Sequence, residues 1–229
     1  MFAPIANGMS FARVRRLNMN KEKDKKKDNA LDNAIDDTTD NAKYNTKGSK
    51  RSFRTVDLAY VAMGAVLISV CSWISIPTVI PFTLQTFAVF FVLSALGGKR
   101  GTISIMVYVF LGAVGVPVFA HFTSGIGVLL GNTGGYILGF IFTGIIYWLS
   151  VYFTGKKLWA EILALLVGLT VCYVFGTVWF MTVYVQANGP VSLAMVLTWC
   201  VIPFIIPDLI KLGLALTLAR RLSPVLKLR

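Results

Sequence analysis

The sequence predicts an all-α integral membrane protein with six transmembrane helices and both termini in the cytoplasm. The composition and the placement of charge support this class. Of the 229 residues, 56% are hydrophobic and 14% are charged, and the mean hydropathy is +0.71. Soluble domains carry more charge and less apolar surface than this. Residues 1–57 hold 13 of the 22 Lys and Arg and 8 of the 10 Asp and Glu. The remaining 172 residues are therefore too apolar for a soluble domain.

Residues 1–57 are expected to form a disordered, basic cytoplasmic tail. Within them, residues 20–50 join a Lys-rich block to a run of Asn, Asp and Thr, with few large apolar side chains to bury. The tail could bind weakly to anionic lipid, or it could be a solvated extension. Residues 58–229 are expected to be the six-helix, substrate-binding membrane domain.

Six segments are apolar enough to cross a bilayer, which requires about 20 mostly apolar residues. They are Leu58–Ile76, Phe82–Leu96, Thr102–Phe119, Gly134–Phe153, Leu158–Val185 and Leu193–Ala219. The second segment is short, because a helix of that length would reach only about 22 Å. It is expected either to continue past the following gap or to lie in a thin, protein-buried place.

The charges between the segments alternate in a way that supports this count. The even connections and the C-terminal end are basic, through Lys99-Arg100, Lys156-Lys157 and Arg220-Arg221. The odd connections, 75–81, 120–133 and 186–192, contain no Lys, Arg, Asp or Glu. Cytoplasmic loops of membrane proteins are enriched in Lys and Arg. The pattern therefore predicts six spans with a cytoplasmic N-terminus and C-terminus.

The residue inventory argues against several function classes. The net charge of +12 would fit a nucleic-acid partner only on a soluble basic face, so no nucleic-acid binding is expected. Beyond residue 57 the acids are Glu161 and Asp208, and His121 is the single histidine. Paired catalytic carboxylates and metal clusters need more than this, so we expect no enzyme, no metal and no cofactor. The three cysteines are expected to be buried free thiols: Cys71, Cys172 and Cys200.

A first group of polar residues lies at the start of the second segment, in IPTVIPFTLQTF. Polar groups inside a membrane domain are tolerated where they face protein or line a cavity. The carboxamide of Gln85 offers donors and an acceptor, which suits a ligand with a ureido or amide group. The alternative is an interhelical hydrogen bond that only holds the bundle together.

A second group lies in SGIGVLLGNTGGYILGF, before and within the fourth segment. Glycines recur at every fourth residue from Gly127 to Gly139, a spacing that permits close helix packing. The GNTGG turn also leads into a helix, whose first backbone N–H groups can bind an anionic group. The candidate binding residues of this turn are Asn132, Thr133, Gly134, Gly135 and Tyr136.

The third group is an acid and a base within IIPDLIKL of the sixth segment. Asp208 precedes Arg220 by 12 residues, which places it about 18 Å inside the cytoplasmic boundary. Lys211 follows at i+3 on the same helix face and can partly neutralise it. A structural ion pair or a proton relay is the alternative to a binding role, but intramembrane charges are usually functional. Glu161, four residues after Lys157, is instead expected in a surface charge pair.

The polar groups and their flanking segments also carry a family resemblance. IPTVIPFTLQTFAVF, LGGKRGTISIMVYVFLGAVGVPVFA, GIGVLLGNTGGYILGF and IPDLIKL, in this order, resemble the BioY family across residues 59–221. That family supplies the biotin-specific substrate-binding (S) components of energy-coupling factor (ECF) transporters. The resemblance implies the six-helix S-component fold, biotin capture from outside the cell, and no enzymatic activity. It also implies uptake driven by a transmembrane coupling (T) protein and two ABC-type ATPases, because this chain has no P-loop motif of its own.

The same resemblance implies a biotin pocket built from Asn132, Tyr136, Asp208 and Lys211, with Gln85 nearby. Biotin presents a ureido ring, an apolar thiophane and valeryl chain, and a carboxylate. We expect Asp208 to accept the ureido N–H groups, Asn132 to lie at the ureido head, and Lys211 to pair with Asp208 or with the carboxylate. Which end of biotin meets which group stays open, and biotin is a transported ligand rather than a cofactor.

The resemblance further implies a small-residue face on the first helix that contacts the T protein. The matching residues are Ala59, Ala62 and Ala65, an imperfect form of the family's Ala-xxx-Ala pattern. Two other functions stay open. One is a stand-alone biotin carrier with Asp208 as a proton-coupling site, and the other is an S component for a different vitamin. An intramembrane enzyme is a third, weaker alternative because His121 is a poor catalytic candidate.

Overall fold

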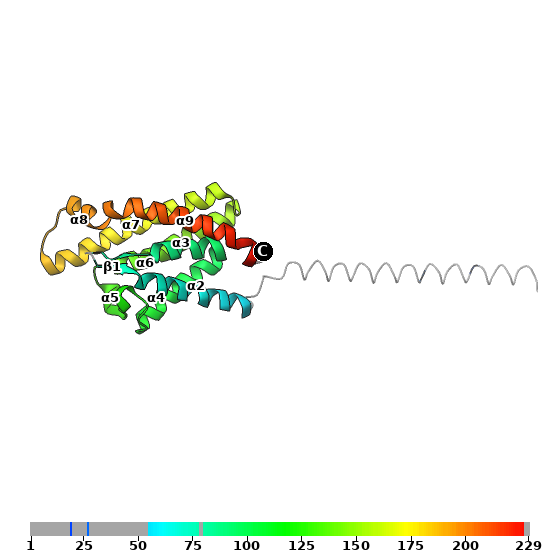
Figure 1. The fold of residues 1–229 in the computed structure, drawn as a ribbon, viewed down its shortest axis with the longest axis horizontal. Coiled ribbons are helices and arrows are strands. Elements are labelled where there is room, and N and C mark those ends of the chain that lie inside the picture. Colours follow the sequence, from blue (N-terminus) through cyan, green and yellow to red (C-terminus); the bar gives the residue numbers. More distant parts are fainter. Residues whose placement is uncertain (1–18, 20–26, 28–54, 78–79, 227–229) are drawn as a thin grey trace, which may run out of the picture. The chain divides into compact units, whose positions relative to one another are not determined.

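The computed structural model describes Met19, Lys27 and residues 55–77 and 80–226, with side chains up to Leu222. The described residues from Thr55 onward belong to one compact unit (Figure 1). The predicted disorder of the tail therefore lies outside the described residues, except at Met19, Lys27 and residues 55–57. At these positions the chain is helical, and residues 55–57 form the start of the first membrane helix.

The compact unit is helical apart from one very short β-ladder. Its elements are α2 (Thr55–Trp73), β1 (Ser75–Ile76), β2 (Phe82–Thr83), α3 (Gln85–Leu96), α4 (Gly98–Val114), the 3-10 turn η1 (Ala120–Phe122), α5 (Ile126–Leu130), α6 (Gly134–Thr154), α7 (Leu158–Asn188), α8 (Leu193–Cys200) and α9 (Ile202–Leu226). The strands pair antiparallel, with Ser75 opposite Thr83 and Ile76 opposite Phe82.

Four parts of the described chain are long and apolar enough to cross a membrane: 55–73, 134–154, 158–188 and the α8–α9 segment 193–222. α3 is apolar but has 12 residues, and α4 has 17. The all-helical membrane class is thereby confirmed, with four apolar spans. The second and third predicted spans are shorter helices than a simple bilayer crossing requires.

Several helix ends differ from the prediction for identifiable reasons. The first helix stops at Trp73, because the chain then pairs as β1 with β2 across a connection that contains Pro77 and Pro81. α4 starts at Gly98 rather than Thr102 and ends at Val114, where Gly115 takes a left-handed backbone conformation with φ of 111°. The last span is broken at Val201 into α8 and α9.

The helices pack in pairs that are distant in sequence. α6 and α7 run side by side along most of their length, α3 packs on α9, and α2 packs on both α4 and α3 (Figure 1). Glycine makes the α6–α7 contact close, because a methyl group on Gly135 would overlap Trp179 and one on Gly139 would overlap Cys172. The predicted packing role of these glycines is thus confirmed.

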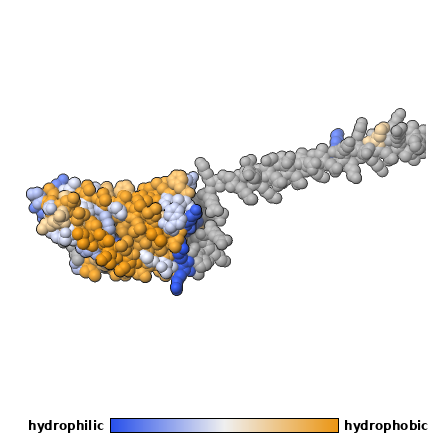
Figure 2. Space-filling view, turned by 90° about the horizontal axis from the view of Figure 1, so that it is seen from above, coloured by the Kyte–Doolittle hydropathy of each residue, from blue (hydrophilic) through white to orange (hydrophobic). Residues whose placement is uncertain are grey.

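The exterior of the compact unit suits a lipid environment. The face seen in Figure 2 carries a broad apolar band with hydrophilic residues toward its ends. Large apolar side chains point outward on every long helix, among them Met63, Phe110 and Ile206, each at least 64% exposed. Soluble monomers rarely expose so much contiguous apolar surface. The apolar band therefore matches the surface of a membrane protein.

The basic connections gather at one end of the bundle, which we call the basic end. The first turn of α2 meets α4 there, through the Asp57–Arg100 ion pair at 2.6 Å. Lys156, between α6 and α7, donates to the carbonyl of Ser94 on α3 at 3.4 Å. The start of α2 and the end of α9 lie together at this end (Figure 1).

Glu161 is also at the basic end, and its predicted surface pairing with Lys157 is wrong. Glu161 is 5% exposed and accepts a hydrogen bond from the Tyr147 hydroxyl at 3.2 Å. Its second oxygen lies 3.5 Å from Arg220 on α9. Lys157 is the N-cap residue immediately before α7, and its side chain is exposed.

Candidate functional site

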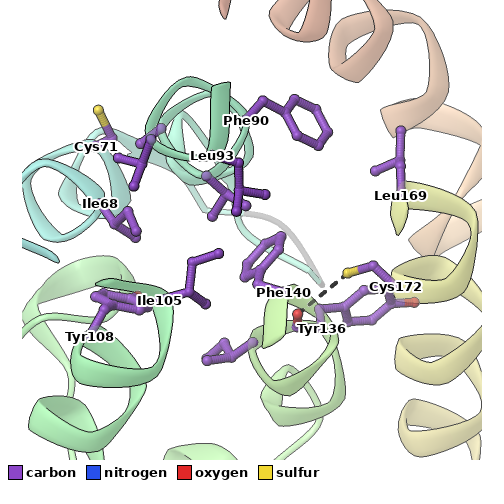
Figure 3. Packing of buried hydrophobic residues seen from close by; sticks show 14 of the residues in the cluster. Ile68, Cys71, Phe90, Leu93, Ile105, Tyr108, Tyr136, Phe140, Leu169 and Cys172 are labelled. Atoms are coloured by element: carbon purple, nitrogen blue, oxygen red, sulfur yellow. Dashed lines mark hydrogen bonds between the residues drawn. The ribbon is translucent and has the colours of Figure 1, made fainter. Parts of the chain in front are cut away.

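A cavity of about 300 Å³ lies between the helices, toward the end opposite the basic end. Its wall comes from the segment before α3, from the segment after α4, and from the facing surfaces of α3, α6, α7, α8 and α9. In Figure 3, Tyr136 of α6 lies beside Cys172 of α7, and both line the cavity together with Phe140 and Leu169. Its volume is in the range of small-molecule sites.

The strongest polar feature of the cavity is the pair formed by Asp208 and Lys211 on α9. The Lys211 ammonium donates to one Asp208 carboxylate oxygen at 2.8 Å, and both residues are buried, at 2% and 6% exposure. The other carboxylate oxygen accepts a hydrogen bond from the Tyr173 hydroxyl at 2.6 Å. Desolvated charges are stable only with such partners, because an unpaired one would be costly. The predicted pairing of Asp208 with Lys211 is confirmed.

Two prolines, Pro203 and Pro207, lie in α9 just before the ion pair. Pro203 stands in the first turn of α9, where its missing N–H costs nothing. Pro207, one turn later, cannot donate to the carbonyl at 203. The side of α9 that faces the cavity carries Phe204, Asp208 and Lys211.

Gln85 is the first residue of α3 and lines the cavity while it is 6% exposed. Its carboxamide nitrogen donates to the hydroxyl of Tyr108 on α4 at 3.0 Å. The interhelical hydrogen bond that sequence offered as the alternative is therefore present. A carboxamide has further donor and acceptor capacity after this bond, so the position can also serve a ligand.

The GNTGG turn contributes only part of what the sequence predicts for it. Thr133 and Tyr136 line the cavity, whereas Asn132, Gly134 and Gly135 are not among its lining residues. The N–H groups of Gly134 and Tyr136 already donate within the turn, at 3.1 Å each. These two N–H groups are therefore not free to bind an anion, contrary to the prediction from the sequence for this turn.

Close packing explains why this turn is rich in glycine. Trp179 of α7 donates from its indole to the carbonyl of Gly131 at 3.1 Å, which ties the turn to α7. Gly134 lies so close to the backbone of Leu129 that a methyl group would not fit. The turn therefore carries Thr133 and Tyr136 to the cavity while its glycines serve packing.

Three residues of α7 and α8 line the cavity although the sequence did not predict them as site residues. Tyr173 lines the cavity and bonds Asp208, and the free thiols of Cys172 and Cys200 lie in the cavity wall. The Cys172 thiol donates to the carbonyl of Tyr136 at 3.5 Å (Figure 3). The three cysteines are buried and unpaired, as predicted. No local pattern marks Tyr173, because its partner is 35 residues away.

The three alanines of α2 that were predicted to contact the T protein do not all lie on the surface. Ala59 and Ala62 are exposed on α2, but Ala65 is 2% exposed and packs in the core. A spacing of three residues turns each alanine by about 60° from the last along a helix of 3.6 residues per turn. The three alanines therefore do not form one outer face, although the first two do lie outside.

The fold and the site together define a class: an all-helical membrane protein with a small-molecule cavity between its helices, lined mainly by apolar side chains and by one buried ion pair. Residues 44–228 match the model of the BioY family. The chain therefore belongs to the BioY family, a family of transporters rather than enzymes.

Individual relatives agree with this membership. The biotin transporter BioY of Thermotoga maritima is 42% identical over 160 residues, which cover 69% of this chain and 89% of the relative. The biotin transporter BioY2 of Lactococcus lactis is 34% identical over 67% of this chain and 82% of the relative. Among solved structures, the S-component for biotin from an ECF-type ABC transporter superposes with a TM-score of 0.66 at 26% identity, over 77% of this chain and 95% of that one.

Proposed function

We propose that this chain is the biotin-binding S component of an ECF-type uptake transporter. The cavity carries the proposal: it has the size for one small molecule, mostly apolar walls, and the Asp208, Lys211 and Gln85 side chains at one side. Apolar pockets with a few placed polar groups are typical of small-molecule sites. Family membership supplies biotin as the ligand to test first.

The polar residues fit the two ends of biotin in a specific way. The carboxylate of Asp208 has lone pairs left after Lys211 and Tyr173 and can accept the ureido N–H groups. Gln85 can take the ureido carbonyl or N–H groups in the place that sequence gave to Asn132. Apolar side chains such as Ile137, Phe140 and Leu169 can receive the thiophane ring and the valeryl chain. Thr133 and Tyr136 add hydroxyls to the cavity wall, and the Tyr136 hydroxyl shares a hydrogen bond of 3.2 Å with Thr177.

The orientation of the protein follows from the same proposal. The basic end would face the cytoplasm, because Lys and Arg concentrate on that side of membrane proteins. The cavity end would then face outward, as capture from outside requires. α3 and α4 would complete six crossings despite their length, since α3 is mostly buried among other helices and α4 packs on α2, α3 and α6. Both termini would be cytoplasmic, and the cytoplasmic tail would end before α2 begins at Thr55.

Transport would depend on partners that supply the energy. The sequence contains no P-loop motif, so ATP hydrolysis would come from two ABC-type ATPases through a T protein. Ala59 and Ala62, on the outer face of α2, would belong to the surface that meets the T protein within the lipid. Uptake of biotin should then require the complete module. Uptake by the chain alone that collapses with the proton gradient would instead favour the stand-alone carrier.

Equilibrium binding tests the ligand directly. Labelled biotin is titrated onto the purified chain in detergent, with desthiobiotin, thiamine and riboflavin as competitors. We expect saturable binding that unlabelled biotin and desthiobiotin displace and that the two other vitamins leave unchanged. Displacement by thiamine or riboflavin would assign the cavity to another vitamin. A folded, monodisperse sample that binds none of them would overturn the proposal.

A further inference from the structure

One part of the cavity wall is not helical. We call Ile80–Leu84 the wall segment; it contains β2 and joins the ladder to α3. Ile80, Pro81 and Thr83 of this segment line the cavity. Its backbone is held by the two-residue pairing with β1 and by the N–H of Leu84, which donates to the carbonyl of Ile74 at 3.1 Å.

The side chain of Lys211 adds a second attachment, from α9. Its ammonium donates to the backbone carbonyl of Thr83 at 2.8 Å, across 128 residues of sequence. The same nitrogen lies 4.3 Å from the centre of the Phe82 ring, which is a cation–π distance. The Phe82 ring also stacks on Phe204 of α9, with ring centres 5.6 Å apart. The wall segment is therefore held against α9 at two adjacent residues.

Asp208 keeps the ammonium in this position. Two of the three N–H groups of Lys211 are used, one by Asp208 and one by Thr83, and both bonds are 2.8 Å long. Charge-assisted hydrogen bonds of this length are stronger than neutral ones, and burial strengthens them further. Asp208 is in turn fixed by Tyr173 of α7. A continuous chain of bonds thus links α7, α9 and the wall segment through the ion pair.

We propose that Lys211 is a positioning residue for the wall segment, so that the Asp208–Lys211 pair controls access to the cavity as well as contacting the ligand. The inference rests on the proposed function only in taking this cavity as the ligand site. Loss of the ammonium frees the Thr83 carbonyl and leaves the Phe82 ring held to α9 by its stacking on Phe204. The wall segment then separates more readily from α9, and molecules pass in and out of the cavity faster.

The native cysteines report such access without any ligand. Cys172 and Cys200 line the cavity, whereas Cys71 is buried on α2 away from it. The full chain is treated with N-ethylmaleimide in detergent, and the modification rate of each cysteine is followed by peptide mass spectrometry. The quantity compared is the rate at Cys172 and Cys200 divided by the rate at Cys71. General loosening of the fold raises all three rates and leaves this ratio unchanged.

Phe82→Leu is the decisive variant, because Phe82 holds the wall segment but is not a lining residue of the cavity. Lys211→Met removes the ammonium, and Lys211→Arg keeps the charge and the donors. Phe110→Leu is the matched control, since Phe110 is 66% exposed on the outer face of α4. We expect Lys211→Met to raise the ratio about tenfold, as the loss of a charge-assisted hydrogen bond implies. Phe82→Leu should raise it about threefold to tenfold, as the loss of a cation–π contact implies. Phe110→Leu should match the wild type, and Lys211→Arg should raise the ratio less than Lys211→Met does.

Two results would overturn the inference. One is an unchanged ratio in both Phe82→Leu and Lys211→Met; the other is an equal rise in Lys211→Met and Lys211→Arg. Biotin kinetics give a second readout: Phe82→Leu should speed dissociation and association together, so that Kd changes less than either rate. Failure of the wild-type chain to bind biotin would remove the proposed function, yet the cysteine ratio would still decide the role of Lys211.

Discussion

The membrane domain contains two buried carboxylates. They have similar hydrogen-bonding partners but lie in different parts of the bundle. Asp208 and Glu161 each accept a hydrogen bond from a tyrosine of a neighbouring helix and each meet a basic residue. Asp208 borders the 300 Å³ cavity, whereas Glu161 does not line it and lies at the basic end. The same set of groups can therefore serve ligand binding in one place and helix attachment in the other.

The distances sharpen this contrast. Around Asp208 the bonds are 2.6 and 2.8 Å long, and its partner Lys211 is almost fully buried. Around Glu161 the distances are 3.2 and 3.5 Å, and the side chain of Arg220 is 48% exposed. Solvent-exposed ion pairs contribute little to stability. The tight, enclosed group is thus the one whose charge we expect to affect ligand binding, and the comparison yields four predictions.

The largest effect is expected from Asp208→Asn. This change removes a charged acceptor from the cavity and should weaken biotin binding by about tenfold to a hundredfold. Isothermal titration or filter binding of the purified variant measures the change in Kd. Glu161→Gln is the matched control, because it makes the same kind of change outside the cavity. Equal losses of affinity in the two variants would show that the contrast between the two sites is false.

Tyr173→Phe comes next in size. The variant keeps the ring and loses the hydroxyl that orients the Asp208 carboxylate, so the expected loss of affinity is about threefold to tenfold. Tyr147→Phe removes the corresponding hydroxyl beside Glu161 and should leave Kd unchanged. Competition with unlabelled biotin gives both values. If Tyr173→Phe binds as the wild type does, Asp208 is held well enough by Lys211 alone.

Glu161→Gln should act on stability rather than on binding. The loss of its charge weakens contacts of α7 with α6 and α9 and should lower the free energy of unfolding by about 1 kcal/mol. Thermal unfolding in detergent, followed by tryptophan fluorescence, detects the shift in Tm, with biotin Kd measured on the same sample. A weakened Kd at unchanged Tm would place Glu161 in the ligand pathway instead.

The smallest effect is expected from deletion of residues 1–50. All cavity-lining residues lie between Ile80 and Lys211, so biotin Kd should stay within about twofold of the full chain. Titration of both forms in the same detergent makes the comparison. A clear loss of binding by a truncated chain that is monodisperse and thermally as stable as the full chain would give the tail a role at the cavity.

The helices themselves could largely be predicted from apolar runs. α6 begins at Gly134 and α7 at Leu158, where the sequence placed them. α4 begins four residues before the predicted Thr102, because Lys99 and Arg100 extend the helix at its polar end. A hydropathy pattern detects the apolar part of a helix and misses charged turns that remain helical at the interface. The hydropathy pattern also misses the break at Val201, because the residues on both sides of the break are apolar.

The candidate site was predicted in part. Asp208 and Lys211 stand out in any apolar run, because charges in a membrane segment are rare and need a partner. Gln85, Thr133 and Tyr136 also reach the cavity, whereas Asn132 is not among its lining residues. One residue of offset in a tight turn points a side chain in another direction, which spacing alone cannot resolve.

The sequence by itself determined the membrane class, the family, the apolar segments and the pair of charges three residues apart, because these depend on composition and local spacing. Tertiary structure decided which groups meet: Tyr173 with Asp208, Lys211 with the carbonyl of Thr83, and Arg220 with Glu161. These contacts join residues 35 to 128 positions apart. Such contacts form only when helices pack face to face, and that packing depends on side chains along whole helices rather than on any one motif.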